Sequence, residues 1–217
     1  MKIFIACYSR TGYTRRLGEI IQSELEARSH EVVLELIQPV KELNRWYMAL
    51  TRILPRIGPG MIRSLFSPSY KAKWLKSYKQ YEQDIHPIAQ KDLSGYDMVL
   101  IGGPKWGCIS FPIARYLKEV TGLEGMNVGI FYTFAGPPLE VFEIELMDVP
   151  MKLRLEATGA RMVASLGLSS AFHEYAIPFA IFKRLSRKLF KKPLDAYTVD
   201  AEYGKEHLKN FLEDLGV

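Results

Sequence analysis

Cysteine is scarce in this sequence. Among its 217 residues only Cys7 and Cys108 are cysteines, and they lie far apart in the chain. Their separation matches neither a zinc site nor a CxxC redox motif. Two thiols in a chain of this size are not typical of a disulfide-stabilised scaffold. We therefore expect a reducing environment and a cytoplasmic protein.

Long hydrophobic runs are also missing. No uninterrupted apolar stretch approaches the roughly 18 residues that a membrane-spanning helix needs. The apolar run near the N-terminus, residues 2–7, is too short for the core of an export signal and is typical of a β-strand. A hydrophobic fraction of 48% and a charged fraction of 24% exclude a disordered tail. We expect a single globular domain over residues 1–217.

Acidic residues are rare in two segments. Residues 40–91 carry a net charge of +7 and residues 168–196 carry +4, so the rest of the chain carries −6 of the total of +5. The sequence thus describes an acidic body with two basic segments. Because the body is acidic and no recognition motif is present, we expect no nucleic-acid partner.

Short apolar runs alternate with amphipathic segments. Buried strands are predicted at residues 2–7, 31–37, 96–103, 126–133 and 161–167. Helices are predicted at residues 13–27, 111–121, 139–157 and 198–215. The third of these is expected to break at Pro150, with Asp148 capping its second piece. Five repeats of this alternation predict an α/β fold, a doubly wound five-stranded parallel sheet with helices on both faces. The basic segments, about 40–91 and 168–196, are interpreted as helical insertions.

The loop after the first predicted strand is rich in hydroxyl groups. It reads Ser9-Arg10-Thr11-Gly12-Tyr13-Thr14 and leads directly into a predicted helix. Backbone N–H groups and the positive end of the helix dipole favour a phosphate there, and Gly12 permits a tight turn. The spacing is neither that of a Walker loop nor that of a dinucleotide fingerprint. The alternative is that Ser9 and Thr11 simply cap the helix.

Two loops together resemble the flavodoxin-like family. The family's phosphate loop follows an S/T-x-T-G-x-T pattern, as residues 9–14 do. The sequence Gly102-Gly103-Pro104-Lys105-Trp106-Gly107-Cys108 resembles its first flavin-ring loop. In this fold the strand order is 2-1-3-4-5 and FMN lies where strands one and three meet. The resemblance covers about residues 1–38 and 92–167, and it implies bound FMN.

The resemblance implies a set of FMN-binding residues in three loops. They are Ser9, Arg10, Thr11, Gly12, Tyr13 and Thr14; Pro104, Lys105, Trp106, Gly107 and Cys108; and Thr133, Phe134, Ala135 and Gly136. No metal site is expected, and no catalytic residue is assigned.

Several of these residues have more than one interpretation. Trp106 is the candidate wall of the flavin ring, although it could instead fold onto the end of the sheet. Tyr132 or Phe134 could cover the other ring face, and Cys108 is interpreted as a bystander thiol. His173 is a candidate proton donor, with an ordinary loop histidine as the alternative.

The insertions contain amphipathic pieces. In the first, Trp46, Leu50, Ile53 and Leu54 share a predicted helical face, residues 55–60 form a predicted turn, and an aromatic stripe follows (Tyr70, Trp74, Tyr78 and Tyr81). In the second, Phe182, Leu185 and Leu189 form a predicted apolar stripe opposite a basic face. These faces could pack on the body, form a lid over the flavin or dock peripherally on an anionic membrane. A homodimer is a further possibility.

The function that we predict from the sequence is that of an FMN-dependent oxidoreductase. It would transfer electrons through bound FMN to a quinone-like or other small acceptor, while the protein holds and tunes the flavin. The alternatives are a flavodoxin-type electron carrier that docks a redox partner protein, and a non-redox binding protein that has lost the cofactor. The sequence has no motif that identifies the electron donor.

Overall fold

The computed structural model describes residues 1–77, 80–171 and 176–217. Its five strands are β1 (Lys2–Cys7), β2 (Glu31–Leu36), β3 (Met98–Pro104), β4 (Asn127–Phe134) and β5 (Arg161–Ser169). All neighbouring strands pair in parallel, in the order β2-β1-β3-β4-β5. The predicted fold class and strand order are therefore confirmed.

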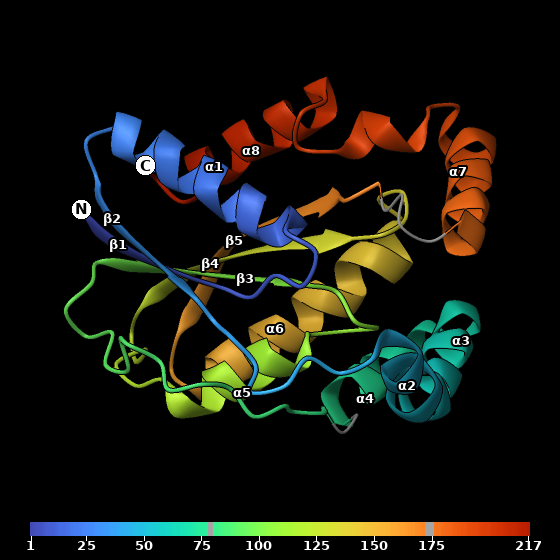
Figure 1. Ribbon diagram of the computed structural model, residues 1–217, viewed down its shortest axis with the longest axis horizontal. Helices are drawn as coiled ribbons and strands as arrows, with labels where there is room; N and C mark the ends of the chain where they lie inside the picture. Colours follow the sequence, from blue (N-terminus) through green and yellow to red (C-terminus); the bar gives the residue numbers. More distant parts are fainter. Residues whose placement is uncertain (78–79, 172–175) are drawn as a thin grey trace.

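Helices cover both faces of the sheet (Figure 1). Helices α1 (Tyr13–Ala27) and α8 (Glu202–Asp214) lie on one face, and α5 (Phe111–Glu119) and α6 (Glu145–Ala157) lie on the other. Alternate side chains of each strand enter different cores, because successive Cβ atoms point to opposite faces. In β1, for example, Ile5 joins the core under α1 and α8, whereas Phe4 joins the core on the opposite face.

The helix after β4 differs from its prediction. A short π-helical segment, η2 (Glu140–Ile144), leads into α6, which runs through Pro150 without a break. Asp148 therefore caps no second helix. Its Oδ1 instead accepts hydrogen bonds from the Tyr132 hydroxyl at 2.8 Å and the Ser165 hydroxyl at 2.7 Å. Burial raises the pKa of the Asp148 carboxyl, and these two hydrogen bonds oppose that rise.

The C-terminal helix begins later than predicted. Residues 194–197 form a 3₁₀ turn, η3 (Leu194–Tyr197), and α8 starts only at Glu202. Leu208, Phe211 and Leu212 of this helix are buried against the sheet.

The first insertion is more helical than predicted. Helix α2 (Arg45–Met48), the π-helical η1 (Ala49–Ile57) and α3 (Gly58–Phe66) follow one another directly, and α4 (Pro68–Ser77) comes after Ser67. The predicted turn at residues 55–60 is wrong, because Pro55 lies within η1 and Pro59 in the first turn of α3, where a missing N–H is tolerated. The extended residue Ser67 separates α3 from α4 instead.

The predicted apolar faces of this insertion are only partly present. Leu50 is 59% exposed whereas Ile53 packs on the core, so these two residues do not share a face. Trp74 of the aromatic stripe is buried, and its indole ring lies against Gly60, where a Cβ would clash with it. The side chains of Trp46 and Leu54 and all of Tyr78 fall outside the described residues.

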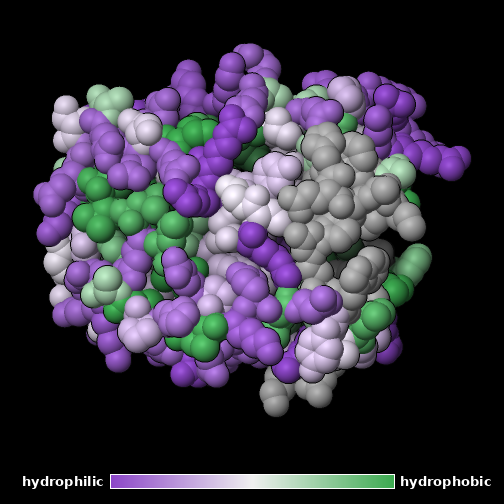
Figure 2. Space-filling model, viewed as in Figure 1, coloured by the Kyte–Doolittle hydropathy of each residue, from purple (hydrophilic) through white to green (hydrophobic). Residues whose placement is uncertain are grey.

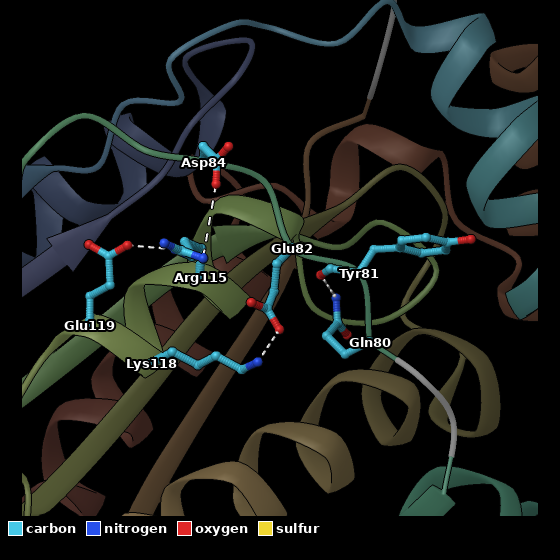
Figure 3. Close-up of polar contacts among 7 residues, drawn as sticks. All are labelled: Gln80, Tyr81, Glu82, Asp84, Arg115, Lys118 and Glu119. Carbon is cyan, nitrogen blue, oxygen red and sulfur yellow. Dashed lines mark hydrogen bonds and ion pairs between the residues drawn. The ribbon is translucent and has the colours of Figure 1, made fainter.

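The two ends of the first insertion are tied to each other and to the body. Val40 N donates to the Asp84 carbonyl at 3.0 Å, and His86 N donates to the Gln38 carbonyl at 2.8 Å. Two ion pairs then join the segment that leaves the insertion, residues 80–84, to α5 (Figure 3). Lys118 pairs with Glu82 at 2.6 Å, and Arg115 pairs with Asp84 at 4.0 Å. The insertion therefore leaves and re-enters the body at one place.

The second insertion contributes α7 (Ala176–Phe190). This helix and the helices of the first insertion lie at the same end of the molecule (Figure 1), where the strands have their carboxyl ends. Leu185 is half-buried as the predicted stripe requires, but Leu189 is 55% exposed.

Candidate functional site

The candidate site lies at the carboxyl ends of β1, β3 and β4. In an open parallel sheet, ligands bind in the crevice outside the strand ends at the point where the strand order reverses. Here that point lies between β1 and β3, whose pairing continues past the strand end through a hydrogen bond from Tyr8 N to the Gly102 carbonyl at 2.9 Å. The loops 9–14, 104–110 and 134–139 all begin at this edge.

The loop from Ser9 to Thr14 has unsatisfied hydrogen-bond donors. Gly12 adopts a left-handed conformation with φ of 89° at the start of α1, and a Cβ added there would meet nothing within 4 Å. No side chain caps α1, and its first turn carries no acidic residue. Among the described residues, no backbone N–H of residues 9–14 donates to another backbone carbonyl. The simple capping alternative for Ser9 and Thr11 is therefore not what the structure shows.

Two side chains of this loop bring further free donors. The Ser9 hydroxyl is buried and has no hydrogen-bond partner among the described residues. Arg10 donates from Nη2 to the Leu43 carbonyl at 2.5 Å, while its Nη1 is buried and has no partner among them. Buried polar groups are usually hydrogen-bonded, so the unpartnered donors gathered in this loop could bind a ligand that has acceptor oxygens.

Thr14 differs from the other hydroxyls of the loop. It is buried, and its Oγ1 lies 2.7 Å from Oγ1 of Thr133. This hydrogen bond joins the start of α1 to the end of β4 and brings together two residues that were predicted separately. Tyr13 and Thr11 are partly exposed beside them.

Trp106 is packed into the core. It is 8% exposed, and its ring meets Tyr8 and Phe111 edge to face, with ring centroids 5.4 Å and 5.3 Å away. The Arg10 guanidinium lies 5.8 Å from the same ring. This is the alternative arrangement considered for Trp106, folded against the end of the sheet.

Lys105 forms a buried ion pair with Glu143. Their charged atoms lie 3.0 Å apart, and the two side chains are 5% and 4% exposed. The pair joins the loop after β3 to η2, which follows the loop after β4. Glu143 was not predicted as a site residue. Its burial could have been predicted, however, because Glu143 lies at helical spacing from Leu146 and Met147, which are buried on the same face.

The first insertion covers the loop after β3. A Cβ on Gly107 would lie 3.1 Å from Ile57 and 3.3 Å from Ile53 of η1. Cys108 is fully buried in a cluster with Ile57 and Trp74. Pro104 ends β3 and is partly exposed.

The second insertion covers the loop after β4. A Cβ on Gly136 would lie 2.9 Å from Oε1 of Glu143 and 3.0 Å from the Phe182 ring of α7. Phe134 is buried, and Ala135 is partly exposed. Tyr132 is fully buried and bonded to Asp148, so it lies beneath α6 and does not face the loop edge.

His173 falls outside the described residues. Within residues 1–77, 80–171 and 176–217, no group of three or more His, Cys, Asp or Glu residues could hold a metal ion. Over the same residues, no helix combines the length and apolar character needed to cross a membrane. Burial raises the pKa of the Cys7 thiol, which disfavours its reactive thiolate form.

Comparison with known proteins finds similarity in structure alone. No protein-family model matches the chain, and no curated protein sequence matches it. The structure of oxidised flavodoxin 2 from Bacillus cereus aligns with a TM-score of 0.52 at 18% identity, covering 100% of this chain and 98% of that one. A flavoprotein in complex with FMN from Lactobacillus acidophilus aligns with a TM-score of 0.49 at 18% identity, covering 78% and 93%. With its five parallel strands in the order 2-1-3-4-5, the chain has the flavodoxin-like fold.

Proposed function

We propose that this protein binds FMN by its phosphate at residues 9–14 and passes electrons through it to a small, quinone-like acceptor. The observation that supports this proposal is the set of unpartnered donors at the start of α1. A dianionic phosphate would accept hydrogen bonds from the Ser9 hydroxyl and the free N–H groups, and the helix dipole would favour its charge. The flavin would supply the redox chemistry.

The residues of the site have distinct tasks in this proposal. Ser9, Thr11 and the backbone around Gly12 would bind the phosphate. The Arg10 guanidinium, held by its hydrogen bond to the Leu43 carbonyl, would partly neutralise the phosphate charge. Lys105 and Glu143 would hold the two ring loops at a constant separation. The loops that would bind the flavin ring are less preorganised than the loop that would bind the phosphate, since Trp106 is packed between Tyr8 and Phe111.

The insertions favour an enzyme over a carrier. A carrier that delivers electrons to a partner protein needs an open flavin edge on which the partner can dock. Here Ile53 and Ile57 cover the loop after β3, and Phe182 covers the loop after β4. Such a covered edge excludes water and admits a small acceptor more readily than a protein surface.

The cofactor and the activity can be tested on the purified chain. We expect yellow protein that releases FMN on denaturation, identified by its mass, and that oxidises NAD(P)H or another reductant when a quinone is added. Bound FMN with electron transfer only to a redox protein would instead support the carrier. Colourless protein that ignores added FMN would contradict the proposal and leave a non-redox binding protein.

A further inference from the structure

Large apolar side chains are exposed on both insertions. In the first, Leu50 is 59% exposed, Ile62 is 60% exposed and Phe66 is 84% exposed. On α7 of the second, Ile181 and Leu189 are each 55% exposed. The helices that carry them lie at one end of the molecule (Figure 1). Apolar side chains exposed together in this way mark a surface that contacts something other than water.

Basic side chains surround these apolar ones. On α3, α4 and α7 the exposed cationic side chains include Arg63, Lys73, Lys76, Lys183, Arg184, Arg187 and Lys188. Those on α7 line a shallow surface depression of about 590 Å³. The sequence has no Asp or Glu between Glu42 and Glu82 or between Glu174 and Asp195. Figure 2 shows green and purple side chains next to each other where α3 and α7 lie. We call this end of the molecule, α3 and α7 with their exposed side chains, the basic-apolar end.

We propose that the basic-apolar end docks on an anionic lipid bilayer, with Phe66 and Ile62 entering the interface and the lysines and arginines contacting lipid headgroups. Exposed apolar residues on a strongly basic helical surface are the pattern of interfacial, non-spanning membrane binding. Each Lys or Arg near such a surface strengthens the attraction.

A bilayer suits this end better than other occupants do. A second copy of the chain would bring two basic surfaces together, and their like charges would repel. Nucleic acid would satisfy the charges, but it offers nothing to Phe66 at 84% exposure. A fluid bilayer can receive apolar side chains from α3 and α7 at separate points while its headgroups meet the cations between them.

Vesicle sedimentation tests this proposal with the full-length protein. We expect binding to vesicles of phosphatidylcholine with about 30% phosphatidylglycerol, and little binding to pure phosphatidylcholine. Salt at about 0.5 M should release most of the protein, because it screens the headgroup charge. Equal binding to both vesicles, or binding to neither, would overturn the proposal. If the true partner were an acidic protein, the chain would bind neither kind of vesicle. The proposed flavin site does not depend on this outcome.

Two variants separate the apolar and the basic contributions. We expect I62S/F66S and, independently, R184E/K188E to weaken binding to the anionic vesicles at least about tenfold. The matched controls lie outside α3 and α7: Val40→Ser, which removes an apolar side chain that is 57% exposed, and Lys205→Glu on α8. All these positions are exposed, so thermal unfolding should be unchanged. Binding by both double variants equal to that of the controls would contradict the proposal.

Discussion

Replacing Lys105 by methionine is expected to lower the free energy of unfolding by about 3–5 kcal/mol. The substitution leaves Glu143 buried at 4% side-chain exposure without the ammonium that lies 3.0 Å away. An unpaired buried carboxylate is costly, because it has lost its hydration and receives no compensating charge. Urea unfolding followed by circular dichroism measures the effect.

The double variant Lys105→Met/Glu143→Leu distinguishes the destabilisation caused by an unpaired buried charge from the net contribution of the ion pair to the free energy of unfolding. We expect it to recover most of the lost stability, since an apolar pair of similar volume often replaces a buried ion pair without loss. The control is Lys209→Met on α8, whose side chain is 72% exposed and lies 3.7 Å from Glu213. It should change stability by less than about 1 kcal/mol. A loss for Lys105→Met no larger than that of the control would refute the buried pair.

Ser9→Ala is expected to weaken FMN binding about tenfold or more, the value of one hydrogen bond to a charged group. The same change should leave the stability of the flavin-free protein unchanged or slightly higher, because the Ser9 hydroxyl is buried and has no hydrogen-bond partner in the part of the chain that the structure describes. Thr14→Ala is a less selective test, since it also breaks the contact with Thr133. Flavin fluorescence titration measures the affinity.

Ser23→Ala is the matched control for this prediction. Its hydroxyl lies on the same helix and donates to the Glu19 carbonyl at 3.0 Å on an exposed face. We expect its FMN affinity to equal that of the unaltered protein. If Ser9→Ala behaved in the same way as this control, Ser9 would not be a phosphate ligand.

The sheet and its layers were predictable because their signals are local. The predicted bounds of β1 and α1 agree with the structure, residues 2–7 and 13–27, since a buried parallel strand shows as a short apolar run and α1 carries Leu17, Ile21 and Leu25 at helical spacing. The strand order followed from the resemblance of two loops to the flavodoxin-like family.

The first insertion was harder to predict because proline is ambiguous from sequence alone. Pro55 and Pro59 indicated a turn, yet the helical segment runs through both. A proline costs a helix most where its missing N–H would have been hydrogen-bonded. In the first turn of α3 that N–H is free in any case. Pro55 and Pro150 are different, because they lie inside η1 and α6, where a proline removes one backbone hydrogen bond, and both helical segments nevertheless continue.

The side-chain arrangement of the candidate site depends on distant contacts. The position of Trp106 is decided by Tyr8 and Phe111, and Glu143 meets Lys105 only once η2 has folded beside β3. The hydroxyl-rich loop at residues 9–14 was recognisable as a motif, and its binding of phosphate stays a prediction. Whether its hydroxyls cap α1 or remain free depends on rotamers and packing, and the structure leaves the Ser9 hydroxyl free.

Comparing FMN with riboflavin tests the central claim most directly, because the two flavins differ only in the phosphate. If residues 9–14 grip that phosphate, FMN should bind at least about a hundredfold more tightly than riboflavin, as two or more charge-assisted hydrogen bonds would be lost. Equal affinities for the two flavins, or no affinity for either, would contradict the account.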